Sequence, residues 1–248
     1  MFGRLRGCYA VFSVVMLASL AGGCASTNSP AADNGQNDPY ESFNRHVFAL
    51  NETLDKNIAE PVAKGYVDVV PDPARDGIHN FLTNLDQPVT LANDILQGEP
   101  LHATQTVGRI VVNSTFGLGG LVDLASPMGI PAHTEDFGET LAIYGAGEGP
   151  YLVLPLFGPS NPRDASGILV DILFDPFTYL GGIREKGWWM AGRETTEFID
   201  ERSQAIDMMD DLRKSSVDIY ATLRSLYRQH RNAEIRGGKP DIQNLPNI

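Results

Sequence analysis

Cysteine is nearly absent from this sequence of 248 residues. Its two cysteines, Cys8 and Cys24, both lie close to the N-terminus. The rest of the chain therefore has no thiols for a disulfide that would cross-link a domain, and no cysteine cluster for a metal ion. Hydrophobic residues make up 42% of the sequence, which is enough to form a folded core without such cross-links.

Positive charge is also scarce. The sequence has 19 Lys and Arg residues against 31 Asp and Glu residues, which gives a formal net charge of −12 at pH 7. Because nucleic-acid binding relies on clustered basic side chains, this balance excludes nucleic acid as the expected partner. It also argues against a polybasic segment as the main membrane contact.

Catalytic motifs are missing as well. The sequence has no G-x-S-x-G motif, and the kinase-like triplet Asp136–Gly138 has no glycine-rich loop to accompany it. His133 lies close to Glu135 and Asp136, but residues so near in sequence rarely converge on one ion, and we expect a structural role for His133. We therefore predict no catalytic residue, cofactor or metal. A Ser–His–Asp site assembled from distant residues remains an alternative.

The first 23 residues have the pattern of a bacterial signal peptide. Arg4 and Arg6 form its basic region, and residues 9–20 form its apolar region. That apolar region is shorter than the ~20 residues that a membrane-spanning helix needs, and small residues follow it directly. We therefore expect export of the chain and removal of residues 1–23.

The sequence Leu-Ala-Gly-Gly-Cys at residues 20–24 resembles a lipobox, with its leucine one position earlier than usual. We predict cleavage between Gly23 and Cys24 and a diacylglyceryl lipid with palmitate on Cys24; simple secretion is the alternative. Ala25 stands where an Asp would favour retention in the inner membrane, so the outer membrane is expected. Residues 24–37 are rich in Ser, Asn, Ala and Gly and are predicted to be a flexible tether.

Residues 38–236 are predicted to form one mainly helical domain, because apolar residues recur at three- and four-residue steps. Residues 237–248 are predicted to be a disordered tail. Asp38 is expected to cap the first helix, Pro61 to end it, and Pro88 to break the second. The other expected helices cover 101–116, 194–212 and a segment that begins at Asp218.

Residues 129–164 contain Gly or Pro every few positions, which excludes a long helix or strand. The middle of this segment, residues 151–157, is nevertheless too apolar for a solvated loop. It must therefore pack against other elements of the domain.

Residues 168–180 are mostly large and apolar, but they are too few to span a bilayer. Two interpretations remain open: a buried core helix, or a helix that lies in one membrane leaflet. Trp188 and Trp189 suit a membrane interface or the edge of a core. The candidate membrane-contact residues are Ile168, Leu169, Ile172, Leu173 and Phe177.

Several motifs of the sequence resemble those of the MlaA (VacJ) family of outer-membrane phospholipid-transport lipoproteins. They are D-P-x-E-x-x-N-R from Asp38, P-x-R-x-G-x-x-N-F from Pro73, L-Q-G at 96–98, and EDFG, LP-x-x-GPS and NPRD within residues 129–164. The resemblance covers approximately residues 38–231.

The resemblance implies a ring-like helical domain, embedded in the inner leaflet of the outer membrane on its periplasmic side, lipid-anchored and held beside a trimeric porin. It also implies an amphipathic channel through which mislocalised phospholipids leave the outer leaflet. A periplasmic lipid-carrier protein would then deliver them to an ABC transporter, which maintains lipid asymmetry. The candidate channel residues lie at 144–160 and are Tyr144, Tyr151, Leu154 and Phe157. The alternative functions are a periplasmic lipid hydrolase and a purely structural lipoprotein.

Overall fold

The structure is a computed structural model that describes residues 37–179 and 183–237, with residues 183–186 described as backbone only. The predicted signal peptide, Cys24, most of the tether and most of the tail lie outside the described residues. Among the described helices, none combines the length and the apolar character that crossing a membrane requires.

Nine α-helices dominate the described residues, joined by a π-helical turn (η1), a 3₁₀ turn (η2) and one short hairpin. In chain order the elements are α2 (Glu41–Leu54), η1 (Asp55–Ala59), α3 (Glu60–Val69), α4 (Asp72–Gln97), α5 (Pro100–Thr115), α6 (Phe137–Ile143), β1 (Leu152–Leu154), β2 (Gly158–Ser160), α7 (Pro162–Phe174), η2 (Pro176–Tyr179), α8 (Ile183–Gln204), α9 (Ile206–Ser215) and α10 (Ile219–Ile235).

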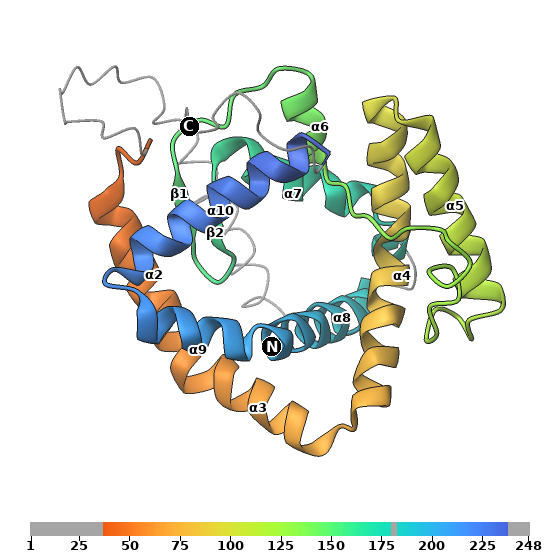
Figure 1. The fold of residues 1–248 in the computed structure, drawn as a ribbon, viewed down its shortest axis with the longest axis horizontal. Helices are drawn as coiled ribbons and strands as arrows, with labels where there is room; N and C mark the ends of the chain where they lie inside the picture. Colours follow the sequence, from red (N-terminus) through yellow and green to blue (C-terminus); the bar gives the residue numbers. More distant parts are fainter. Residues whose placement is uncertain (1–36, 180–182, 238–248) are drawn as a thin grey trace, which may run out of the picture. The chain divides into compact units, whose positions relative to one another are not determined.

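Within residues 37–237 the helices follow one another around a ring (Figure 1). Helices α2 and α3 form one side, α4 forms the next with α5 on its outer face, and α6 and α7 continue the circuit. The C-terminal helices then close it: α8 contacts α3 and α4, α9 contacts α3, and α10 contacts α6 and β2. The predicted mainly helical ring is therefore confirmed.

Two of the predicted helix boundaries at proline are wrong. Pro61 lies in the first turn of α3, directly after the π-helical turn Asp55–Ala59, and the chain stays helical from α2 to α3. Because a wide π turn leaves the usual hydrogen-bond ladder, it accommodates the missing N–H of a proline. Pro88 lies inside the continuous helix α4, which packs against α5, α6, α7 and α8. Those contacts on several sides hold α4 together across the proline.

Two further boundaries differ from the prediction. Asp38 does not cap the first helix; its carboxylate instead accepts hydrogen bonds from Asn44, Tyr220 and Arg224. The predicted helix 194–212 is two helices, because α8 ends at Gln204 and α9 begins at Ile206. The predicted start of the last helix at Asp218 is confirmed, because the side chain of Asp218 caps α10 by accepting the N–H of Ala221.

Asparagine side chains of α2 make hydrogen bonds to the backbone of the apolar segment 151–157. In a larger sheet, a further strand would make these hydrogen bonds. Asn44, which is fully buried, donates to the carbonyl of Tyr151 and accepts the N–H of Val153. Two helical turns further on, Asn51 bonds the backbone at Leu154 and Leu156 in the same way. Side-chain amides therefore replace the neighbouring strand that β1 lacks on this edge.

A small core forms where that hairpin meets the first and last helices. Tyr151 and Val153 pack against Val47 of α2 and Tyr220 of α10. The rings of Tyr151 and Tyr220 are 6.1 Å apart and meet edge to face. The irregular segment is therefore packed under other elements, as its composition predicts.

Glycine residues allow helices α6 and α7 to pack closely against each other. A Cβ atom on Gly167 of α7 would lie 2.5 Å from the backbone nitrogen of Gly138 in α6. A Cβ on Gly138 would lie 2.7 Å from Asp164 Oδ1 and from a guanidinium nitrogen of Arg231. Because atoms do not approach so closely, only glycine fits at either position.

Gly167→Ala is therefore expected to destabilise the domain by about 1–3 kcal/mol, because α6 and α7 must separate. Gly192 offers a matched control, since it also lies in a helix and has no atom within 4 Å of its Cβ position. Gly192→Ala should stabilise the domain by up to about 1 kcal/mol through helix propensity alone. Denaturant unfolding followed by circular dichroism measures both, and a neutral Gly167→Ala would contradict the close approach.

Candidate functional site

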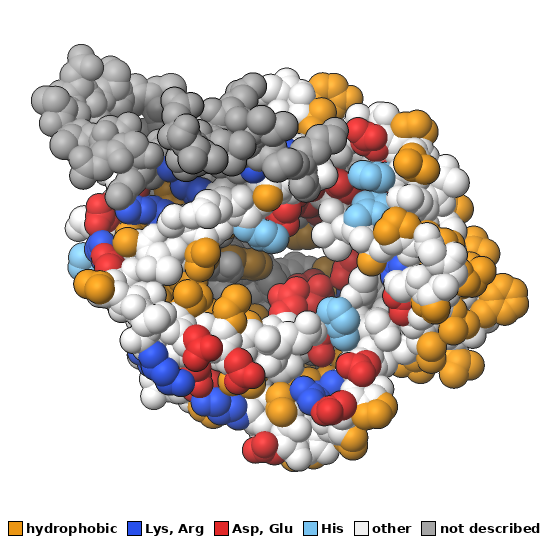
Figure 2. Space-filling model, in the orientation of Figure 1, with side chains coloured by type: hydrophobic (Ala, Val, Ile, Leu, Met, Phe, Trp, Pro, Cys, Tyr) orange, Lys and Arg blue, Asp and Glu red, His pale blue; other side chains and the backbone are white. Residues whose placement is uncertain are grey.

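The centre of the ring is the candidate site, because the face seen in Figure 2 is hollowed there. Acidic and histidine side chains gather around the hollow in this view. The polar residues that join the helices of the ring fall into four clusters. Each cluster connects helices that are distant in the sequence.

The first cluster is centred on Arg231 of α10. Its guanidinium donates to both carboxylate oxygens of Asp136 at 2.6 Å, to both oxygens of Asp164 at 3.1 and 3.2 Å, and to Glu139 at 2.8 Å. Asp136 caps α6 and Asp164 lies in the first turn of α7. One arginine therefore holds three helices together.

The protonation of this cluster follows from its surroundings. Burial opposes ionisation of Asp164, but hydrogen bonds from Tyr227 and Arg163, with the charge of Arg231, hold its pKa below the usual value. Glu139 behaves in the opposite way. Burial, a hydrogen bond with Glu135 and the charge of Asp136 raise the pKa of Glu139 to about 9, so this side chain is neutral at pH 7.

The second cluster joins α4 to α8 and to the end of α7. Arg193 of α8 pairs with Asp86 of α4 and with Asp175, which lies 2.5 Å away at the end of α7. Burial and the charge of Asp86 raise the pKa of Glu197 to about 8. Burial likewise raises the pKa of Asp86 and that of Glu201. More carboxyl groups therefore meet here than the single arginine neutralises.

The other two clusters join the ends of the described chain. Arg213 of α9 pairs with Glu52, Asp55 and Glu60 at 2.6–2.9 Å, and Arg202 of α8 shares Asp55. In the fourth cluster, Arg224 of α10 donates to Asp38 at 2.6 Å, where both side chains are almost fully buried. In all four, arginines of the last three helices meet acids from earlier in the chain.

The distribution of polar and apolar side chains is inverted relative to a water-soluble domain. Among the described residues, twenty polar or charged residues are buried and only eight hydrophobic ones are, whereas thirty-one large hydrophobic residues are exposed. Folded proteins in water seldom bury ionised groups and seldom expose large contiguous apolar patches. The exposed surface of the described residues is therefore unusually apolar.

Helix α7 carries part of that exposed apolar surface. It contains four of the five predicted membrane-contact residues, and all four are exposed: Ile168, Leu169, Ile172 and Leu173. These four side chains are therefore not part of a core. Phe177 differs, because it is half-buried in η2 with the guanidinium of Arg193 5.8 Å from its ring centre. Trp188 and Trp189 of α8 are both exposed, and the side chains of Arg184 and Lys186 lie outside the description.

Sequence reasoning missed a second apolar surface on α5 and the loop that follows it. Figure 2 shows hydrophobic side chains gathered over this part of the ring. Its exposed members are Leu101, Val107, Val111, Phe116, Leu118, Leu121, Val122 and Met128. The signal in the sequence is the frequency of apolar residues in 116–128, a segment with too many glycines to form a core helix.

The four candidate channel residues do not share one environment. Tyr151 is only 3% exposed and belongs to the core, so its predicted place at an opening is wrong. The apolar composition of the segment around Tyr151 could not distinguish a channel wall from a core. Leu154 is half-buried, and Tyr144 and Phe157 are exposed. The hydroxyl of Tyr144 donates to the carbonyl of Leu96 at 2.6 Å, which ties the end of α6 to α4.

The fold and the side-chain distribution together define a class: a helical ring closed by buried ion pairs, with many exposed apolar side chains and a central hollow. Comparison with known proteins is consistent with that class. The family model of the MlaA lipoprotein matches residues 36–234, and this chain belongs to that family.

Curated relatives cover nearly the whole chain. The intermembrane phospholipid transport system lipoprotein MlaA of Escherichia coli K12 is 36% identical over 229 residues, which is 91% of this chain and 88% of that protein. The protein of the same name from Haemophilus influenzae is 33% identical over 234 residues, or 92% and 91% of the two chains.

A solved structure from work on the structural basis for maintenance of bacterial outer membrane lipid asymmetry also matches. It superimposes with a TM-score of 0.70 at 38% sequence identity, and the match covers 80% of this chain and 98% of that chain.

The raised pKa of Glu197 predicts a pH dependence of stability. Glu197 has a pKa of about 8 in the folded state against an ordinary value of 4.5, so folding favours its protonated form. The stability is therefore complete below pH 4.5 and falls as the pH rises from 4.5 to 8. Each pKa unit corresponds to about 1.4 kcal/mol, and solvent screening at this partly exposed site reduces the total to about 1–2 kcal/mol.

Glu197→Gln should remove this loss, because glutamine stays neutral and still donates to Asp86. The variant is expected to match the wild type at pH 5 and to unfold at a higher denaturant concentration at pH 8.5. Glu194→Gln, on the exposed face of the same helix, is the control and should change little. An equal gain at both pH values would show that Glu197 does not titrate as described.

Proposed function

We propose that this protein removes phospholipids from the outer leaflet of the outer membrane and passes them toward the periplasm, which maintains lipid asymmetry. The observation that carries the proposal is the inverted ring. Among the described residues, thirty-one large hydrophobic residues are exposed, while twenty polar or charged residues are buried. A phospholipid requires such a combination, because its tails need apolar surroundings and its head group needs polar ones.

The family supports the same reading. The relatives in E. coli and H. influenzae are named as lipoproteins of an intermembrane phospholipid transport system. In the proposed arrangement, Cys24 carries the lipid anchor, the domain lies in the periplasmic leaflet, and a trimeric porin and a periplasmic lipid carrier are its partners. A rigid neighbour is physically reasonable for a ring without a membrane span, since otherwise little fixes its height and tilt.

We further propose that the protein transports lipid without cleaving it. In cells that lack this chain, outer-leaflet phosphatidylethanolamine should increase, as measured by labelling with an amine-reactive reagent that does not cross the membrane. Re-expression of the wild type should reverse the increase. Purified protein incubated with phospholipid vesicles should release no fatty acid or head group.

The outcomes separate the candidate functions. Unchanged labelling in the deletion strain would contradict lipid removal and favour a structural lipoprotein. Increased labelling together with sustained fatty-acid release, abolished by substitution of one Ser or His, would favour the hydrolase. Increased labelling without release supports transport.

The exposed face of α7 provides the test of membrane placement. Leu173 is 61% exposed, and a charge placed among acyl chains costs about 2.5–3.5 kcal/mol on insertion scales. In a Cys24→Ser background, Leu173→Asp should therefore move the domain into the soluble fraction while it remains folded and protease-resistant.

Leu85 of α4 is the matched control, because it is buried in the described structure. Leu85→Asp should unfold the domain, since a charge in a packed interior lacks compensation. If Leu173→Asp also loses its cooperative melt, then Leu173 packs inside the protein and the leaflet assignment of α7 is wrong.

A further inference from the structure

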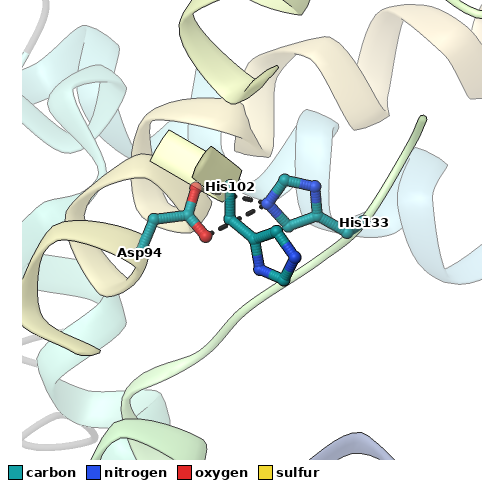
Figure 3. A group of neighbouring side chains, drawn as sticks. All are labelled: Asp94, His102 and His133. Carbon is teal, nitrogen blue, oxygen red and sulfur yellow. Dashed lines mark hydrogen bonds and ion pairs between the residues drawn. The ribbon is translucent and has the colours of Figure 1, made fainter. Parts of the chain in front are cut away.

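Three side chains from separate segments converge at the corner between α4 and α5. Asp94 lies in the last turn of α4, His102 lies in the first turn of α5, and His133 comes from the irregular segment before α6. Figure 3 shows a ring nitrogen of His133 turned toward the carboxylate of Asp94, with the ring of His102 beside that of His133. One ligand atom from each residue lies within 4.8 Å of the others.

Asp94 is a fully buried carboxylate that lacks an ordinary cationic partner. Thr106 donates to its Oδ2 at 2.6 Å, and Nε2 of His133 lies 3.1 Å from its Oδ1. Among the described residues, no Lys or Arg forms an ion pair with Asp94; its partner is His133. Because a buried negative charge requires compensation, this site favours a cation.

Both histidines have a nitrogen without a partner. Nδ1 of His102 and Nδ1 of His133 are buried and accept or donate no hydrogen bond within the described residues. The two rings face each other with centres 4.7 Å apart. A hydrogen-bonding nitrogen buried without a partner is unfavourable, and coordination of a metal ion would satisfy Nδ1 of His102. His133 would coordinate the same ion through Nε2, the nitrogen that already faces Asp94.

A cavity of about 310 Å³ adjoins the cluster and gives an ion a route to it. His102, His133 and Glu135 are among the residues that line it. Oε1 of Glu135 lies 4.0 Å from Nδ1 of His102, close enough to supply a further oxygen ligand after a small movement. Asp136, which stands next in the sequence, instead caps α6 and binds Arg231, so it is not part of the cluster.

We propose that Asp94, His102 and His133 bind one divalent transition-metal ion, with Zn²⁺ as the best fit. Two imidazoles and a carboxylate, with Glu135 or water as the fourth ligand, form a common zinc donor set. Zinc–nitrogen bonds of ~2.0–2.1 Å draw tetrahedral ligands to about 3.3 Å from one another. The three ligand atoms now lie within 4.8 Å of one another, so they would move closer together when the ion binds.

The ion would have a structural role. It would join the α4–α5 corner to residues 129–136, the segment that leads into α6 and its contacts with Arg231. Sequence reasoning considers Glu135 and Asp136 as possible co-ligands of His133, rejects them, and assigns His133 a structural role. Asp94 and His102 were missed because they lie 39 and 31 positions away from His133 and share no motif with it.

The test uses the mature chain purified without a histidine tag, with Cys24→Ser to remove the only mature thiol. Zn²⁺ is titrated against a chromophoric chelator, and Co²⁺ is added separately so that absorption between 500 and 700 nm reports the ligand geometry. We expect one Zn²⁺ per chain, a higher melting temperature with Zn²⁺, and a tetrahedral Co²⁺ spectrum.

His102→Ala should lower Zn²⁺ affinity by at least about 100-fold while circular dichroism remains unchanged, because that ring is half-exposed and its Nδ1 has no hydrogen bond. His230→Ala, at an exposed histidine of α10, is the matched control and should leave the affinity unaltered. Asp94→Asn, which keeps the shape of the carboxylate, should also weaken binding.

The proposal is overturned by absence of Zn²⁺ binding, or by binding that His102→Ala and Asp94→Asn leave intact. In either outcome Asp94 and His133 form a simple ion pair. If His102→Ala unfolds, X-ray absorption spectroscopy of the zinc-loaded wild type tests the proposal instead. A coordination shell with two imidazoles supports the site, and a shell without imidazole excludes it. None of these results depends on lipid transport, so the proposed function is tested separately.

Discussion

The ring depends on arginines that bring distant acids together. Arg231 is the central case, because it bonds both oxygens of Asp136 and both oxygens of Asp164 while also reaching Glu139. Burial of so many charges is favourable only when the geometry satisfies nearly every polar atom. That demand fixes the relative positions of α6, α7 and α10 more sharply than apolar packing would, since apolar contacts tolerate sliding and two-pronged guanidinium contacts do not.

The same contacts explain in physical terms two of the sequence motifs that resemble those of the family. EDFG supplies Asp136 and Gly138, and NPRD supplies Asp164, and all three residues meet at Arg231. Gly138 admits the guanidinium, and Gly167 admits the backbone of α6. The two motifs therefore form one contact site around Arg231. This site lies where the C-terminal helix closes the ring.

Much of the helical fold could be predicted from sequence because a three- to four-residue apolar period is a local property. The continuity of α4 through Pro88 could not, because contacts with four other helices outweigh the lost hydrogen bond. The ion-pair clusters were also out of reach, since one sequence does not reveal that Arg231 and Asp136 meet across 95 positions. Tyr151 shows the limit for apolar residues: composition indicates that it is covered, and only the fold shows that Tyr220 covers it.

The inverted distribution of side chains also constrains how the fold is stabilised. With eight buried hydrophobic residues among those described, apolar burial within the chain contributes less than in an ordinary domain of this size. Acyl chains around the exposed faces of α5 and α7 would bind the folded ring and not the unfolded chain, and such binding shifts the equilibrium toward the folded state. Low polarity outside the ring would at the same time strengthen the ion pairs within it. The membrane and the arginine junctions would therefore act together, each making the other more effective.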